Sequence, residues 1–115
     1  MLIAVAGPYS ASTEEQKQAN LDAMNEAAAQ VYKLGHIPII GVNAGLPVAL
    51  MLPESDRRDV INGISFAIVE KCEAILMIGS SPGADKEREI IEHKGLPVYY
   101  SIDEIPFSNK LDPGH

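Results

Sequence analysis

The chain has 115 residues, of which 46% are hydrophobic and 22% are charged, and its formal net charge is −7 at pH 7. This length and composition predict one globular domain and exclude a disordered chain. The acidic balance excludes a broad basic face for a nucleic-acid polymer, although a few backbone N–H groups and one arginine suffice to bind a single phosphate.

The chain contains one cysteine, Cys72. A single cysteine forms neither an intrachain disulfide nor a thiolate metal cluster, which fits a reducing compartment. No basic and apolar leader precedes the first predicted strand, and no apolar run approaches the roughly 18 to 20 residues of a membrane span. We therefore expect a cytoplasmic protein with no membrane partner, no metal and no cofactor.

The first third of the chain is predicted to form a βαβ unit. The apolar run Leu2–Ala6 ends at a Gly-Pro pair and indicates a strand that is buried on both faces. In the helix that follows, Ser12 and Glu15 have capping-box spacing, apolar residues recur every three or four positions, and Gly35 comes after the last turn. The second strand is predicted at Ile37–Gly41.

The middle of the chain is harder to assign. Residues 42–54 are apolar but interrupted by glycine and proline, so they predict a loop or one short helix that begins near Pro47. Ser55 is predicted to cap a third helix that reaches about Lys71. The apolar run Ala74–Ile78 is the third predicted strand.

The last part of the chain adds one helix and one strand. A helix is predicted from about Ala84 to Lys94, and residues 97–101 form the fourth strand. Ser101 is predicted to cap one last turn. We expect residues 1–105 to form a single domain and residues 106–115 to be a frayed tail.

Strands that alternate with helices predict an α/β fold, a flavodoxin-like or Rossmann-like three-layer sandwich. Its parallel sheet is expected in the order 2-1-3-4, with helices on both faces. Ligands of such folds bind outside the carboxyl ends of the strands, where the strand order reverses. The two loops at that point are GPYS after the first strand and GSSPGA after the third.

The loop after the third strand has the parts of an anion-binding turn. Gly79 and Gly83 allow close backbone approach, Ser80 and Ser81 offer hydroxyls, and the next helix presents unpaired N–H groups. The loop has neither the Walker A nor the Gly-x-Gly-x-x-Gly pattern. The structural alternative is a plain turn in which Ser81 caps the helix.

Glu87 is the unusual acid of this region. It lies three and four residues before Ile90 and Ile91, on the buried face of the helix, whereas Asp85 and Glu89 are rotated towards solvent. The alternative is that Asp85 and Glu87 merely complement the helix dipole. Burial raises the pKa of such a carboxyl and a helix N-terminus lowers it.

Several motifs resemble one family. The segments AGPYS, LGHIP, CEAILMI, SPGADKE and KGLPVYY, with Asn20 in the first helix, are similar to the nucleoside 2-deoxyribosyltransferase-like superfamily. The resemblance is to its small bacterial and phage members, similar to deoxynucleoside monophosphate N-glycosidases, and it spans about residues 1 to 100. Ser81, Gly83, Glu87 and Gly95 keep the intervals of the family motif.

The resemblance implies roles for individual residues. Glu87 corresponds to the nucleophile that attacks C1′ of the sugar, and Ser81, in the turn with Gly83, to the residue that contacts the sugar or a 5′-phosphate. Gly7 and Tyr9 of the first loop are expected to line the site. Family members are often oligomeric, so a homo-oligomer is expected.

The sequence departs from the family in the third helix. The family has an Asp there that holds the sugar and assists the leaving base, and its place falls here on Ile64 or Ser65. Asp59 lies further back on the same helix and is kept as a candidate for substrate binding.

The cations offer candidates for phosphate binding. Arg57, Arg58 and Arg88 could meet a 5′-phosphate, and Arg88 lies beside the anion-binding turn, although charged residues on helices are more often simply solvated. His36 and His93 are expected in structural roles.

Two functions remain open. One is an enzyme that cleaves or transfers the N-glycosidic bond of a (deoxy)nucleoside or its 5′-monophosphate. The other is a nucleotide-binding module that lacks the chemistry. A phosphoacceptor receiver domain is set aside, because AVAGPYS has no acid at the end of the first strand. In both cases the partner is a small-molecule nucleoside or nucleotide.

Overall fold

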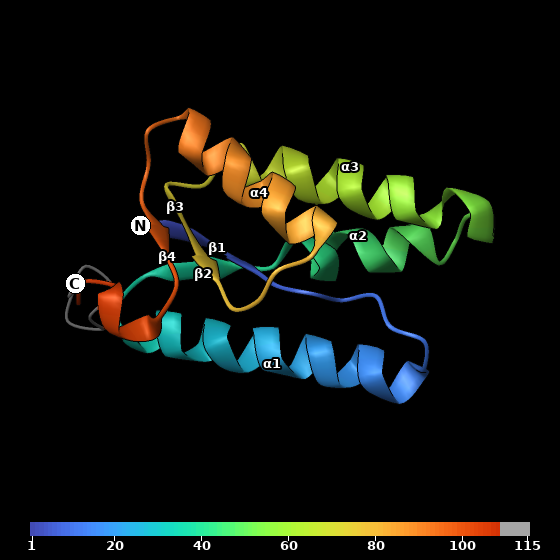
Figure 1. Cartoon of the computed structure of the whole chain (residues 1–115), viewed down its shortest axis with the longest axis horizontal. Coiled ribbons are helices and arrows are strands. Elements are labelled where there is room, and N and C mark those ends of the chain that lie inside the picture. The colour runs from blue at the N-terminus through green and yellow to red at the C-terminus, as the bar shows by residue number, and fades with distance from the viewer. Residues whose placement is uncertain (109–115) are drawn as a thin grey trace.

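A computed structural model describes residues 1–108 and has a four-stranded, parallel sheet in the order β2-β1-β3-β4 (Figure 1). The predicted α/β fold class and strand order are therefore confirmed. Among the helices of residues 1–108, none combines the length and the hydropathy that a membrane span requires. The helices and strands, in chain order, are β1 (Leu2–Ala6), α1 (Glu14–Lys33), β2 (Ile37–Ile39), α2 (Gly41–Ala49), η1 (Glu54–Asp56), α3 (Arg57–Val69), β3 (Ala74–Met77), α4 (Pro82–His93), β4 (Val98–Tyr99) and η2 (Ile102–Glu104).

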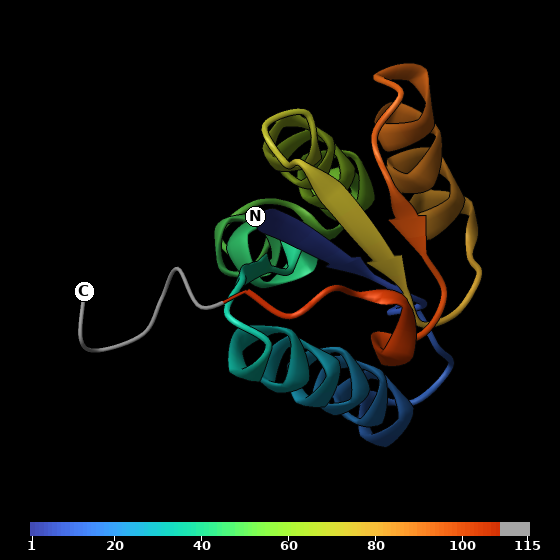
Figure 2. The same cartoon turned by 90° about the vertical axis from the view of Figure 1, so that its left-hand side faces the viewer.

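The sheet is covered on both faces, with α1 on one side and α3 and α4 on the other (Figure 2). Side chains of β1 alternate between two apolar clusters, because successive residues of a strand point to opposite faces. Ile3 and Val5 belong to the cluster that includes Met24 of α1. Ala4 and Ala6 belong to the cluster that includes Ile91 of α4. Both faces of β1 are therefore buried, as its apolar sequence predicts.

Helix α1 begins one residue later than expected. Its N-cap is Thr13, whose hydroxyl accepts a hydrogen bond from Gln16 N at 3.1 Å, so the expected cap at Ser12 is wrong. Thr13 and Gln16 repeat the capping-box spacing of Ser12 and Glu15, and spacing alone does not separate the two. At the other end, Gly35 has φ +90°, the left-handed conformation expected after a helix.

Helix α2 departs most from the sequence prediction. It begins at Gly41, which was expected to end the second strand, and Pro47 lies inside it, not at its start. Pro47 deletes only one intrahelical bond, and tertiary packing offsets that loss in a short helix. The packing is close: a Cβ atom on Gly45 would lie 3.0 Å from Ile61 Cα of α3. Figure 1 shows α2 and α3 running side by side beyond the sheet.

Two further helix starts differ from the expectation. Ser55 lies within the 3-10 turn η1 and caps nothing, since α3 starts after Asp56. The turn satisfies the backbone there, because Asp56 N donates to Pro53 O at 2.9 Å. Helix α4 begins two residues earlier than expected, because proline at its first position needs no N–H partner.

The C-terminal segment is held at its beginning. Ser101 caps η2, as expected. Buried His36 donates from Nε2 to Pro106 O at 2.6 Å, which supports a structural role for this histidine. Ser108 N donates to Leu34 O at 2.7 Å, so the segment expected to fray is anchored as far as Ser108. The rest of that segment, 109–115, lies outside the described residues.

The start of α1 gives a direct test of helix capping. Thr13→Ala removes the acceptor for Gln16 N–H and is expected to lower the free energy of unfolding by ~1 kcal/mol in urea titrations. Ser12→Ala, at an exposed residue outside the helix, is the matched control and should change it by less than ~0.5 kcal/mol. A larger loss for Ser12→Ala than for Thr13→Ala would contradict this helix start.

Candidate functional site

A cleft of about 980 Å³ opens beyond the carboxyl ends of β1 and β3. Its walls come from the loops after these strands, from α2 and α3, and from the starts of α1 and α4. Six of the seven site residues predicted from the sequence line it: Gly7, Tyr9, Asp59, Ser81, Gly83 and Glu87. The switch in strand order thus produces a ligand-sized cleft where such folds bind ligands.

Glu87 is the buried acid of this cleft. It projects from α4 on the same side as Ala84 and Ile91, and only 9% of it is exposed. Ser81 and Pro82 set the start of α4 and therefore the rotation that brings Glu87 inward. The position inferred from the spacing of Glu87 before Ile90 and Ile91 agrees with the structure.

Ser65 is the hydrogen-bond partner of Glu87. It lies in α3, is 3% exposed, and its hydroxyl donates to Glu87 Oε1. Burial raises the pKa of Glu87, and the hydrogen bond from Ser65 opposes this rise without cancelling it. Loss of solvation on burial is therefore the larger of the two effects on the pKa of Glu87.

The loops after β1 and β3 interlock through their glycines. A Cβ atom on Gly7 would lie 2.7 Å from Ile78 Cγ1, and one on Gly79 would lie 2.8 Å from Pro8 Cδ. A side chain at either glycine would therefore force Ile78 or Pro8 to shift. The loop after β1 is also tied to α1, because Asn20 Nδ2 donates to Tyr9 O at 2.9 Å. Together these contacts hold the floor of the cleft.

Ser81 and Ser80 behave differently. The Ser81 hydroxyl accepts a hydrogen bond from Ala84 N at 3.1 Å, so the alternative interpretation of Ser81 as a helix cap is correct. This bond uses an oxygen lone pair, and the hydroxyl proton is still able to donate to a ligand. Ser80 does not line the cleft, and its hydroxyl donates to the carboxylate of Asp85 at 2.9 and 3.0 Å.

The structure separates the three candidate arginines. Arg57 and Arg58 line the cleft, and Arg57 Nε donates to Leu52 O at 3.3 Å. Arg88 does not line it and pairs with Glu92 at 3.4 Å, so its contact with a 5′-phosphate stays a prediction. It directly follows Glu87, and successive helix residues are rotated by about 100° from one another.

Sequence reasoning missed Asn62. This residue lines the cleft, and its Oδ1 would be 3.5 Å from a Cβ atom on Gly83. Within residues 1–108 its side chain takes part in no hydrogen bond, which leaves the amide available to a ligand. The spacing of Asp59, Asn62 and Ser65 every three residues along α3 is the signal that could have found it. Asp59 itself lies about 9 Å along the helix axis from Ser65.

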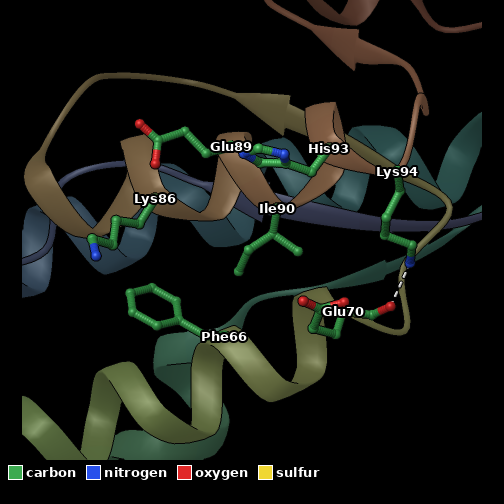
Figure 3. A pocket seen from close by; sticks show the side chains of 7 residues that line it. All are labelled: Phe66, Glu70, Lys86, Glu89, Ile90, His93 and Lys94. Atoms are coloured by element: carbon green, nitrogen blue, oxygen red, sulfur yellow. Dashed lines mark hydrogen bonds between the residues drawn. The ribbon is translucent and has the colours of Figure 1, made fainter.

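A smaller groove of about 390 Å³ lies between α3 and α4 (Figure 3). Phe66 and Ile90 face each other across it, and charged residues surround them. Lys94 Nζ donates to the carbonyl oxygens of Glu70 and, at 3.1 Å, Cys72, so this lysine closes the end of α3. Burial raises the pKa of Cys72 to about 11, which keeps the thiol neutral and agrees with a core residue.

The chain matches no protein-family model and no curated protein. Its resemblance to the nucleoside 2-deoxyribosyltransferase-like superfamily therefore stays a prediction. What the structure adds is a buried carboxyl, a serine that binds it and a serine-glycine turn beside it, all in one cleft. Any function has to be argued from these groups.

Burial of Glu87 predicts a pH-dependent gain in stability for Glu87→Gln. The folded-state pKa is raised, so ionisation of Glu87 lowers stability as the pH rises from the unfolded pKa to the folded one. Each unit between the two values costs about 1.4 kcal/mol, and the uncharged Gln avoids this cost while its amide oxygen still accepts from Ser65. In urea titrations Glu87→Gln should be more stable than the native chain at pH 8 and equal to it near pH 3.5.

The exposed Glu89 of the same helix provides the control. Glu89→Gln makes the same chemical change where water solvates the charge, so we expect no such gain at pH 8. Equal pH dependence of the two variants would contradict the burial of the Glu87 charge.

Proposed function

We propose that this protein cleaves or transfers the N-glycosidic bond of a nucleoside or a nucleoside 5′-monophosphate, with Glu87 as the nucleophile at C1′. The observation that carries the proposal is the carboxyl of Glu87: this residue is buried, accepts a hydrogen bond from Ser65 and lines a ligand-sized cleft. Acids in such surroundings are uncommon unless they take part in chemistry or binding.

The reaction needs few groups. A carboxylate oxygen of Glu87 forms a bond to C1′ while the C1′–N bond breaks. The electron pair of the C1′–N bond leaves with the base, which takes up a proton. Water or a second base then breaks the glycosyl ester and restores the carboxylate. The first outcome is hydrolysis and the second is transfer.

The raised pKa of Glu87 is compatible with this role. The ionised carboxylate is poorly solvated in the free protein, because burial disfavours its charge. Positive charge that develops on the sugar near C1′ offsets this penalty in the transition state. Burial therefore lowers the stability of the free anion more than that of the reacting complex.

The rest of the cleft offers groups for the two ends of the substrate. The Ser81 hydroxyl and the first turn of α4 suit the sugar or its 5′-phosphate, and Gly83 leaves space there. Arg57 and Arg58 are the arginines that line the cleft. Apolar side chains of α2, including Leu46, suit a flat base.

We also propose that the protein acts in the cytoplasm as a homo-oligomer. The end of α2 and the residues after it expose apolar side chains, among them Leu50 at 52% and Met51 at 84%. Burial of this end against a second subunit would remove apolar surface from water. Leu50 also lines the cleft, so such a contact would lie beside the site.

A nucleotide-binding module is the second candidate. Ile64 or Ser65 stands where the resemblance implies an Asp, and neither side chain is a good acid for the leaving base. The acid of α3, Asp59, is six residues or about 1.7 turns away from Ser65. A chain with this arrangement would bind a nucleotide and leave it intact.

Incubation with nucleosides and nucleoside monophosphates separates the two candidates. We expect the native chain to release free base, detected by mass spectrometry, and Glu87→Ala to be at least ~1000-fold slower because the nucleophile is lost. Glu89→Gln keeps the charge of the cleft unchanged and should retain the native rate. Base release that survives Glu87→Ala would refute the proposed mechanism.

Thermal melting tests the binding module on the same samples. A nucleotide that binds only the folded chain raises the melting temperature, and the rise grows with the logarithm of its concentration above Kd. A rise without any release of base would favour the binding module over the enzyme.

A further inference from the structure

We infer that Ser65, placed by Gly41, is a positioning residue that holds Oε1 of Glu87 and leaves Oε2 as the oxygen that reacts. The reaction at Oε2 rests on the proposed function, whereas the placement of the carboxyl rests on contacts alone. Three features carry the inference: the choice of partner that Ser65 makes, the space at Gly41 and the free oxygen of Glu87.

The first feature is the partner of Ser65. A serine in the middle of a helix commonly donates to the carbonyl oxygen four residues earlier, here that of Ile61. The Ser65 hydroxyl donates to Glu87 Oε1 on another helix. This bond links α3 to α4 inside the cleft, where water does not compete, because both residues are buried.

The second feature is the contact between Ser65 and the first residue of α2. A Cβ atom on Gly41 would lie 2.7 Å from Ser65 Cβ and 2.8 Å from Ser65 Cα, and nearer still to its hydroxyl. Gly41 has no positive φ, so it is required for space and not for its conformation. The Ser65 side chain is confined between the backbone of α2 and the carboxyl of Glu87.

The third feature is the other oxygen of the carboxyl. Within residues 1–108 no hydrogen bond is made to Glu87 Oε2, and Glu87 lines the cleft. With Oε1 held, rotation of the carboxyl is restricted, and Oε2 is the carboxyl oxygen to which residues 1–108 donate no hydrogen bond.

This arrangement gives each oxygen one task. Oε2 forms the bond to C1′ as the C1′–N bond breaks and its electron pair leaves with the base, which is then protonated. Oε1 becomes the carbonyl oxygen of the glycosyl ester and keeps the hydrogen bond from Ser65. When water or a second base attacks C1′, Ser65 stabilises the carboxylate that leaves.

The same hydrogen bond sets the titration of Glu87. It lowers a pKa that burial raises, so its removal should raise the pKa further. The ionisable groups that share the cleft with Glu87 are Tyr9, Glu14, Lys17, Glu54, Arg57, Arg58, Asp59 and Lys86. Cys72 also lies close enough to Glu87 to interact with its charge. The Cys72 thiol, with a pKa of about 11, stays uncharged while Glu87 titrates.

Nuclear magnetic resonance of the side-chain carboxyl carbon of Glu87, followed against pH in the full chain, tests the placement without any substrate. Ser65→Ala should raise the pKa of Glu87. Gly41→Ala should raise it by a similar amount, and the double variant should add nothing, since both changes remove one hydrogen bond. Gly63→Ala, where a Cβ atom meets nothing within 4 Å, should leave it at the native value.

Enzyme kinetics test whether Ser65 positions the carboxyl of Glu87 for the reaction. Ser65→Ala should lower kcat by roughly 10- to 100-fold with little change in KM, because the lost bond acts on the nucleophile and not on substrate binding. Ser101→Ala removes a hydroxyl that caps η2 and should keep native kcat and KM. A rise in KM at unchanged kcat would overturn the positioning role.

The titration also has outcomes that overturn the inference. A native pKa of Glu87 in Ser65→Ala would overturn it entirely. A native pKa in Gly41→Ala, or failure of that variant to fold, would overturn the part assigned to Gly41. If no chain releases base, the proposed function fails, and the titration still decides the placement of the carboxyl.

Discussion

The hydrogen bond between Ser65 and the carboxyl of Glu87 is the interaction on which the site depends. Burial of an acid lowers stability unless the charge is compensated, and one neutral hydroxyl compensates it only in part. The fold tolerates this penalty at the one place where the strand order reverses. A residue that lowers stability in a cleft of this kind is typical of functional sites, where stability and activity compete.

The remaining elements place this pair. Parallel pairing of β1 with β3 brings the loop after each strand to the same edge of the sheet. The glycines of those loops let them interlock, and Ser81 fixes the start of α4 and hence the direction of Glu87. On the other side, Gly41 brings α2 against Ser65. The walls of the cleft thus approach one another closely at three glycines, where a Cβ atom would force its neighbours to shift.

Much of this was open to prediction because it follows from spacing within one element. Apolar runs indicated the strands, and the distance of Glu87 from Ile90 and Ile91 placed it on the buried face of α4. Contacts between elements leave no such spacing, so the approach of Gly41 to Ser65 was not predictable. The spacing along α3 could have placed Asn62 on the same face as Ser65, but not beside Gly83. The predicted start of α1 was wrong because neighbouring hydroxyls are equivalent candidates for the cap. The predicted start of α2 was wrong because tertiary packing retains Pro47 inside the helix, which the local sequence does not indicate.

Covalent trapping would test the central claim, that Glu87 reacts with an anomeric carbon. A 2′-fluoro nucleoside or its 5′-monophosphate slows the breakdown of a glycosyl ester, because fluorine disfavours the positive charge of the transition state. Intact-mass and peptide mass spectrometry should then find one sugar, or one sugar phosphate, attached to Glu87. An adduct on another residue, or release of base from the unmodified substrate through a chain that never carries the sugar, would contradict the account.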